Sequence, residues 1–182
     1  MKKSSFAVLG VLLLVSGAIT ADEGTSSDVA VETIEPFHYA AIEMTGSYDQ
    51  HREAFQTLYE QLPAQGISQQ EAPFGIYYDD PAQVPLENLK WEIGIALPEE
   101  KELKKPLTLK RWPYATLVTV EYEGPFTDTG MGAIFGKLFG WMEAHNYSAA
   151  GPVMQKFLSE MTQNSQGQWV GKVKVLIPAT KN

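Results

Sequence analysis

PYATLVTVEYEGPF, residues 113–126, decides how this chain folds. Its run of Leu and Val residues predicts a strand, and Gly124-Pro125 predicts a turn that leads to a helix. The same layout occurs once before, in residues 36–48, PFHYAAIEMTGSY. Both stretches place an aromatic residue after a proline, continue as a short strand and end at a glycine.

The correspondence continues beyond these two stretches. Ala54-Phe55 corresponds to Ile134-Phe135, and Pro73-Phe74 corresponds to Pro152-Val153. Each pair lies about 80 residues apart, which indicates a duplicated unit. The alternative is a chance similarity between short apolar strings.

Each copy reads as β-α-β-β, with repeat 1 at about 31–97 and repeat 2 at about 107–178. We expect strands at 31–44, 74–78, 90–97, 107–122, 153–158 and 170–177, and helices at 49–65 and 130–145. Both helices carry an apolar stripe with helical spacing, typical of one buried face. We expect the stripe residues in the core: Phe55, Leu58, Tyr59 and Leu62 in the first helix, and Ile134, Phe135, Leu138, Phe139, Trp141 and Met142 in the second. The prediction is a single α+β domain, residues 31–180, with pseudo-twofold symmetry. Its antiparallel sheet would carry both helices on one face and a ligand groove on the other.

Residues 1–21 have the features of a Sec-type signal peptide. Lys2 and Lys3 precede an apolar run at residues 6–15, and small residues lead to Ala21. We expect cleavage there and a flexible lead-in at 22–30, which places the mature protein in the periplasm or outside the cell. An uncleaved N-terminal anchor is the alternative. No cysteine follows the apolar run, so a lipoprotein anchor is excluded.

Composition excludes several function classes. The chain has no cysteine, which removes disulfides, thiolate catalysis and zinc–cysteine sites. Its 22 acidic residues outnumber 14 basic ones, and losing Lys2 and Lys3 makes the mature chain more acidic still. Such a surface repels phosphate backbones and anionic lipids. We therefore expect neither nucleic acid nor membrane as a partner, and the oligomeric state stays open.

Sequence motifs for cofactors and catalysis are weak. Residues 130–136 read GxGxxxG, out of register for a dinucleotide fingerprint, and indicate a helix start capped by Asp128 or Thr129. His38, His51 and His145 are scattered, without the spacing of a metal site. We expect no metal and no cofactor.

Strand alternation identifies the candidate site. Apolar residues of 90–97 and 170–177 would face the helices, which leaves Glu92 and Lys172 on the opposite face. An offset of eighty residues places these two at matching positions in the repeats, with Gly94 leaving space beside Glu92. The face would then be a groove with one charge of each sign. The expected aromatic walls are Tyr77, Trp112, Phe126, Phe157 and Trp169. The alternative is that all these are ordinary solvated residues.

In four short pieces the chain resembles the GyrI-like small-molecule-binding domain, the effector-binding fold of multidrug-responsive transcription regulators. The pieces are residues 75–81, 121–126, 151–158 and 175–178, and the resemblance runs from about Val31 to Ala179. It implies a groove between two β-α-β-β halves that holds flat, often cationic, aromatic compounds. It also implies a glutamate in the last strand, where this chain has Lys172.

The resemblance leaves three functions open. A non-enzymatic, exported protein that binds a flat aromatic or hydrophobic molecule needs no further residues. A hydrolase of electrophilic compounds, as some relatives are, would use Glu92 and Tyr77, although Lys172 at the usual glutamate position argues against it. A haem or tetrapyrrole carrier is the third, because the SOUL haem-binding fold has a related architecture.

Overall fold

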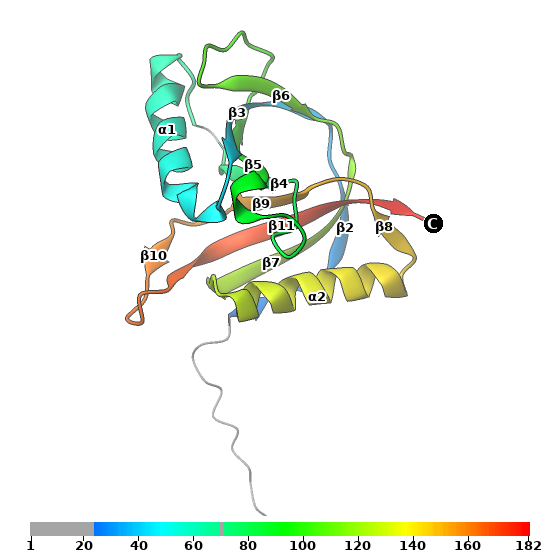
Figure 1. The fold of residues 1–182 in the computed structure, drawn as a ribbon. Coiled ribbons are helices and arrows are strands. Elements are labelled where there is room, and N and C mark those ends of the chain that lie inside the picture. Colours follow the sequence, from blue (N-terminus) through cyan, green and yellow to red (C-terminus); the bar gives the residue numbers. More distant parts are fainter. Residues whose placement is uncertain (1–23, 70) are drawn as a thin grey trace, which may run out of the picture.

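The computed structural model describes residues 24–69 and 71–182 as one antiparallel sheet with two helices (Figure 1). The predicted signal peptide, residues 1–21, lies outside the described residues. The elements are β1 (Thr25–Ser26), β2 (Ala30–Thr33), β3 (Phe37–Thr45), α1 (His51–Ala64), β4 (Phe74–Tyr77), β5 (Lys90–Ala96), β6 (Thr108–Trp112), β7 (Thr116–Pro125), α2 (Asp128–Ala144), β8 (Tyr147–Ala149), β9 (Val153–Phe157), β10 (Thr162–Gln163) and β11 (Trp169–Lys181).

The sheet has the predicted duplicated topology. Its strand order is β1-β7-β11-β9-β4-β5-β3-β6, so β4 of one repeat and β9 of the other pair at the centre. Going outward, each is followed by the last strand of its own repeat, β5 or β11, and then by its first, β3 or β7. The fold is α+β with two β-α-β-β halves.

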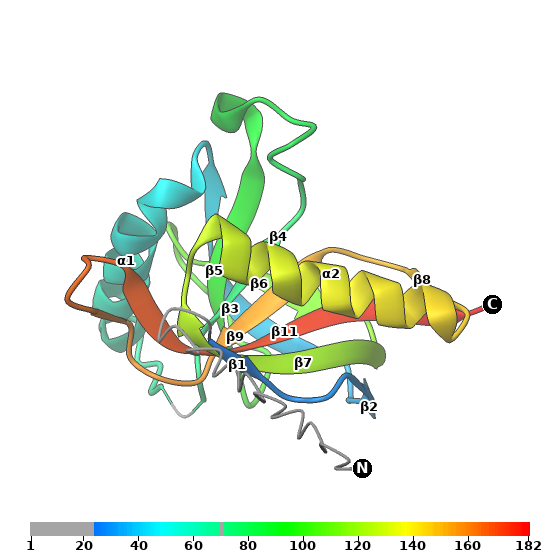
Figure 2. The same cartoon turned by 90° about the horizontal axis from the view of Figure 1, so that it is seen from below.

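Both helices lie on one face of the sheet and leave its central strands between them (Figures 1 and 2). Ala54, Leu58 and Leu62 of α1 recur every four residues and pack on β3 and β5. In α2, Ile134, Leu138 and Met142 pack in the same way on β7 and β11. Neither helix in the described part of the chain is long and apolar enough to span a membrane.

Two predicted strands are each divided by a proline. The stretch predicted as 31–44 forms β2 and β3, with Pro36 between them, and 107–122 forms β6 and β7, with Pro113 between them. Proline has no N–H to give to a ladder, so it ends the pairing there. The cap of α2 is Thr127, whose Oγ1 accepts a hydrogen bond from the Gly130 N–H at 3.1 Å. The prediction of Asp128 or Thr129 was therefore wrong.

Part of the expected lead-in at 22–30 pairs with the sheet. Thr25 and Ser26 form β1 on the edge of β7, and β2 pairs with the same strand further along. Lys137 of α2 donates hydrogen bonds to Ser26 Oγ and to the Ser27 carbonyl. This N-terminal segment is therefore bound to both the sheet and a helix.

Candidate functional site

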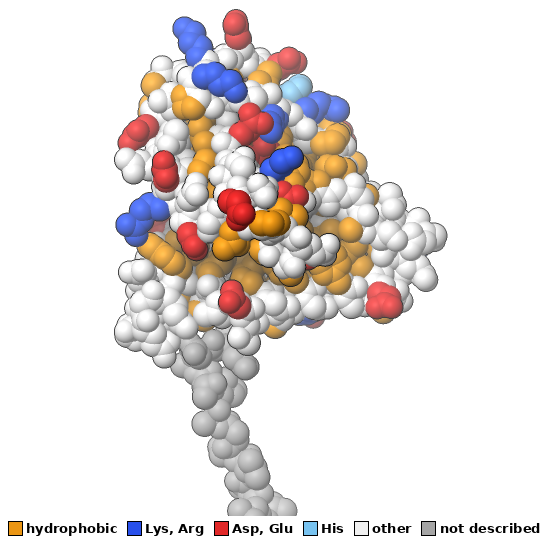
Figure 3. All heavy atoms as spheres, viewed as in Figure 1, with side chains coloured by type: hydrophobic (Ala, Val, Ile, Leu, Met, Phe, Trp, Pro, Cys, Tyr) orange, Lys and Arg blue, Asp and Glu red, His pale blue; other side chains and the backbone are white. Residues whose placement is uncertain are grey.

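Two cavities lie at the two ends of the groove that α1 and α2 leave over β4 and β9. The first, the Tyr77 cavity, has a volume of about 640 Å³, and the second, the Phe157 cavity, about 780 Å³. Both volumes lie in the range of small-molecule sites. In the space-filling view, hydrophobic side chains gather between the regions of α1 and α2, with acidic residues among them (Figure 3).

Several aromatic side chains line the Tyr77 cavity. Tyr77 lies on the floor, where its hydroxyl is 2.7 Å from His51 Nε2. Tyr48 packs edge-on against Tyr77, with 5.1 Å between ring centroids. Phe135 and Phe139 form the α2 wall. Burial lowers the pKa of His51 and raises that of Tyr77, so both are neutral near pH 7.

Three carboxylates line the Tyr77 cavity. Asp79, Asp80 and Asp128 are lining residues, and among the residues described there the lining contains no Lys or Arg. Backbone N–H groups hold two of these carboxylates, with Lys90 N–H donating to Asp79 at 2.7 Å and Ala82 N–H to Asp80 at 2.9 Å. Burial, followed by the charges of Asp79 and Asp80, raises the pKa of Tyr48 to about 12. The cavity thus combines aromatic rings with carboxylates.

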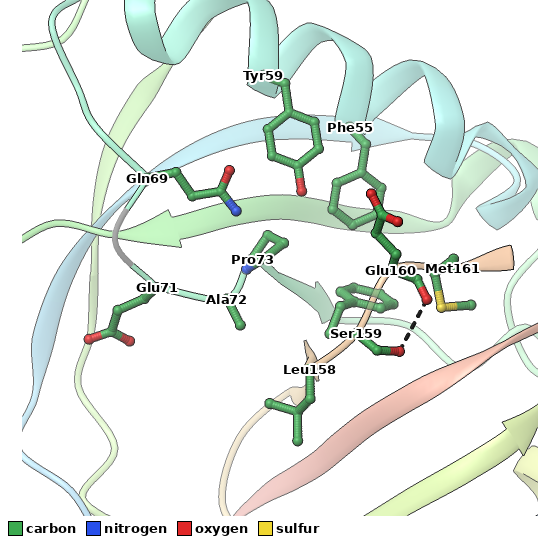
Figure 4. A pocket seen from close by; sticks show the side chains of 11 residues that line it. Phe55, Tyr59, Gln69, Glu71, Ala72, Pro73, Leu158, Ser159, Glu160 and Met161 are labelled. Carbon is green, nitrogen blue, oxygen red and sulfur yellow. Dashed lines mark hydrogen bonds between the residues drawn. The ribbon is translucent and has the colours of Figure 1, made fainter.

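The Phe157 cavity is built from the other ends of the same strands (Figure 4). Phe55 and Tyr59 project from α1 toward the segments that contain Pro73 and Ser159. Phe157 meets Phe55 edge to face, with ring centroids 5.2 Å apart. This cavity is also lined without Lys or Arg among the residues described.

The two cavities are related by the internal repeat. Phe55 and Tyr59 correspond to Phe135 and Phe139, each eighty positions later in the chain. Likewise, the segment Tyr77–Pro81 corresponds to Phe157–Met161. Duplication has thus produced the same cavity twice, with different side chains.

Glu92 lies on the opposite face of the sheet, as strand alternation predicted, but it is buried rather than open. It is 1% exposed, and the space beside Gly94 is filled by Tyr39 and Phe74. Glu92 Oε1 accepts hydrogen bonds from the Tyr39 hydroxyl at 2.5 Å and the Tyr78 hydroxyl at 2.9 Å. Its Oε2 lies 2.5 Å from Lys110 Nζ.

The pKa shifts of Tyr39, Tyr78 and Lys110 fix the protonation states of these three groups around Glu92. Burial, with the hydrogen bond to Glu92, raises the pKa of Tyr39 well above its usual range. Burial and the charge of Glu92 raise the pKa of Tyr78 to about 12. For Lys110, burial lowers the pKa, but hydrogen bonds to Glu43 and Glu92 outweigh it and the net shift is upward. Tyr39 and Tyr78 are therefore neutral donors, and Lys110 is a cation.

The strand registers show that Lys174, not Lys172, matches Glu92. Glu43 pairs with Glu92, and Glu121 pairs with Lys174. Gly46 and Gly124 end equivalent strands, so Glu43 matches Glu121, and their partners match too. The predicted match failed because a constant offset of eighty does not hold across the last strand.

Lys174 forms the counterpart of the Glu92 ion pair with the signs reversed. Its Nζ lies 2.6 Å from Glu32 of β2, just as Glu92 pairs with Lys110 of β6. Lys110 pairs with Tyr39 of β3, and Glu32 pairs with Leu117 of β7. Tyr39 and Leu117 are equivalent positions of the two repeats. An apolar cluster that includes Trp112 lies on the same face as these ion pairs. The prediction of an open groove on this face was therefore wrong around Glu92, where side chains are packed together.

The remaining predicted site residues are dispersed. Trp112 is 1% exposed in that apolar cluster. Lys172 pairs with Glu121 at 2.7 Å, and Phe126 packs under α2. Trp169 is exposed and lies against the Arg52 guanidinium. Of the seven, Tyr77 and Phe157 line the two cavities.

Sequence reasoning missed the helix-side walls. Tyr59 and Phe139 were assigned to the cores of their helices, yet they are 43% and 47% exposed. The signal was present, because both extend their helix stripes beyond the residues that the sheet buries. Tyr48 and Asp128 were also missed, since each lies in the first turn or just before a helix.

Solved structures with the same fold include the C-terminal domain of EcmrR. It matches with a TM-score of 0.68 and 15% identity, over 85% of this chain and 98% of that chain. EcmrR in complex with DNA matches with a TM-score of 0.69 and 16% identity, and there the match covers 58% of the EcmrR chain. A crystal structure described as a hydrolase from Listeria innocua has a TM-score of 0.63 at 13% identity, over 84% of this chain and 92% of that one.

Sequence comparison gives the same assignment. A putative transcriptional regulator of Bacillus subtilis, the SPbeta prophage-derived YosT, is 21% identical over 142 residues, which are 75% of this chain and 92% of the relative. The model of the GyrI-like small molecule binding domain matches residues 27–179. That match covers both repeats and the groove between them, so this chain belongs to the GyrI-like family of small-molecule-binding domains.

Proposed function

We propose that this protein is exported and binds a flat aromatic cation in the Tyr77 cavity. The observation that carries the proposal is the lining of that cavity, in which aromatic rings stand beside Asp79, Asp80 and Asp128. Rings such as Tyr77 and Phe139 offer faces for stacking, and the carboxylates attract positive charge. The family assignment supports small-molecule binding in general.

A panel of fluorescent dyes tests this proposal. Ethidium is a flat aromatic cation, Nile red is neutral and 8-anilinonaphthalene-1-sulfonate is an anion. We expect ethidium to bind most tightly, and Asp128→Asn to weaken ethidium about fivefold, roughly 1 kcal/mol, while Nile red is unaffected. Asp28→Asn is the control, because Asp28 is no part of the cavity lining. Equal affinity for all three dyes would reject the cation preference.

Hydrolysis is the second candidate, and the Glu92 cluster is the observation that favours it. A buried carboxylate with two tyrosine hydroxyls resembles an acid–base site. The predicted pair of Glu92 and Tyr77 does not form, because these side chains lie on opposite faces of the sheet. The Lys110 ammonium also occupies the second oxygen of Glu92. Ester turnover that disappears in Glu92→Gln would favour this candidate over binding alone.

The haem-carrier alternative has less support. Of the three histidines, His51 alone lines either of the two cavities, and its Nε2 is hydrogen-bonded to Tyr77. We propose a small molecule as the partner, and neither nucleic acid nor membrane, because the chain is strongly acidic.

A further inference from the structure

We propose that the Phe157 cavity is a second binding site for a flat aromatic cation, so that one domain holds a ligand at each end of its groove. This inference rests on the proposed function, because it takes the Tyr77 cavity as the first site. Nothing in the mechanism of the first site requires the second cavity. Its volume of about 780 Å³ is nevertheless as large as that of a complete ligand site.

The first argument is that aromatic wall residues occur at equivalent positions in the two repeats. Phe55 and Tyr59 of α1 occupy the positions that Phe135 and Phe139 occupy in α2. The floor residue Phe157 likewise takes the position of Tyr77. Tyr59 is 43% exposed and Phe139 is 47% exposed, so neither ring is needed to complete the core. Stacking against a ligand explains why both repeats have an aromatic ring at this exposed position.

The second argument is charge. Glu160 in the Phe157 cavity corresponds to Asp80 in the Tyr77 cavity, which places a carboxylate at the same end of each. The other carboxylate of the lining, Glu71, is already paired with Lys156 at 2.9 Å. Glu160 has no ion pair among the residues that the structure describes. It is therefore the group that a single positive charge would meet.

The differences between the cavities determine which ligand each prefers. Phe157, Leu158 and Ser159 replace Tyr77, Tyr78 and Asp79, so the second cavity has fewer hydrogen-bonding groups and less negative charge. Met161 here, like Met131 in the Tyr77 cavity, offers a polarisable thioether to an aromatic ring. A ligand there would be an aromatic monocation with few polar substituents, and it would bind more weakly than in the Tyr77 cavity.

The two cavities are separate enough to hold two molecules. They lie at opposite ends of the central strand pair, because Pro73 and Phe157 are at one end and Tyr77 and Val153 at the other. Four strand residues span about 13 Å at the usual rise per residue.

Methionine methyl NMR tests the second site directly, because each cavity contains one methionine. Met131 lines the Tyr77 cavity and Met161 lines the Phe157 cavity, while Met142 and Met154 are buried controls. On titration of the methyl-labelled protein with ethidium, we expect Met131 and Met161 to shift with different midpoints. Met142 and Met154 should stay largely unmoved. Isothermal titration should give two ethidium molecules per chain.

A matched pair of variants assigns the sites. Tyr59→Ala should weaken the Met161 transition at least fivefold and leave the Met131 transition unchanged, and Phe139→Ala should do the reverse. One ethidium per chain with Met161 unmoved would overturn the second site and leave the proposed function standing. One ethidium per chain that shifts both methyl groups would also overturn it, because a single ligand would then span the groove. If neither methyl group moves, the proposed function fails as well.

Discussion

At the scale of single residues, Glu92 depends on Lys110. The carboxylate is 1% exposed, and Lys110, whose side chain is 25% exposed, supplies its counter-charge at 2.5 Å. Two tyrosine hydroxyls complete its coordination on the other oxygen. A buried charge that keeps its hydrogen bonds but loses its counter-ion is strongly destabilising.

Lys110→Met should therefore lower the free energy of unfolding by roughly 2–3 kcal/mol, below the full value for a buried pair because Lys110 is partly exposed. Urea unfolding at pH 7 measures this change. Lys105→Met is the matched control, since the Lys105 side chain is 82% exposed and its Nζ lies as far as 3.9 Å from the nearest Glu43 oxygen. A loss no larger than that of the control would show that Lys110 does not stabilise Glu92.

Residue-level prediction from the sequence succeeded where alternation was sufficient. The period of two placed Glu92 on the face away from the helices. Tyr77 and Phe157 were expected as walls of a groove on that same face, whereas in the structure they line cavities on the helix side. Alternation could not identify Lys110 as the partner of Glu92, because that contact depends on how β6 pairs with β3. Lys172 was misassigned for the same reason, since β11 is shifted by two residues relative to the assumed repeat.

At the scale of elements, two kinds of glycine behave differently. A Cβ at Gly124 would lie 2.4 Å from Gly24 Cα, where β1 crosses the end of β7. Gly136 and Gly140 lie inside α2 with nothing within 4 Å of an added Cβ. The first glycine is needed for close backbone approach, whereas the other two only weaken their helix.

Gly140→Ala should raise the free energy of unfolding by about 0.5–1 kcal/mol, because alanine loses less backbone entropy in a helix. Gly124→Ala should lower it by roughly 1–3 kcal/mol, because the N-terminal segment must move. Thermal unfolding of the two variants beside the parent measures both changes. Should Gly124→Ala leave stability unchanged, β1 would not pack on β7 as described.

The helices and the longer strands were predictable because the sequence pattern of each one occurs in both repeats. Helices 51–64 and 128–144 and strands β4, β5, β9 and β11 occur within a few residues of the expected ranges, whereas the expected strands 31–44 and 107–122 are each divided by a proline. The short strands β1, β8 and β10 were missed. Each has only two or three residues, too few to show a hydrophobic period, and each exists because a longer strand offers it a pairing edge.

At the scale of the whole molecule, location and ligand are linked. An exported protein meets compounds before they reach the cytoplasm, so export would make this chain a binder of molecules outside the inner membrane. N-terminal sequencing of the protein isolated from its source should find a mature chain that starts near Asp22. A cytoplasmic chain that retains Met1 would contradict export.

The position of the groove could not be predicted from the sequence, although the fold could. A duplicated β-α-β-β pattern specifies two helices on one face, and the ligand groove was therefore expected on the opposite face. In the structure the helices cover the outer strands and leave β4 and β9 between them, while Tyr39, Phe74 and Trp112 fill the opposite face. Which face stays open depends on helix spacing and on large side chains from distant strands.

The affinity of ethidium for two variants on opposite faces tests the central claim most directly. Phe139→Ala alters the groove between the helices, and Glu92→Gln alters the packed face behind the sheet. The helix-side site predicts that Phe139→Ala weakens ethidium about tenfold, roughly 1.4 kcal/mol, while Glu92→Gln changes it less than about twofold. Loss of binding in Glu92→Gln with full affinity in Phe139→Ala would place the ligand on the other face and contradict the account.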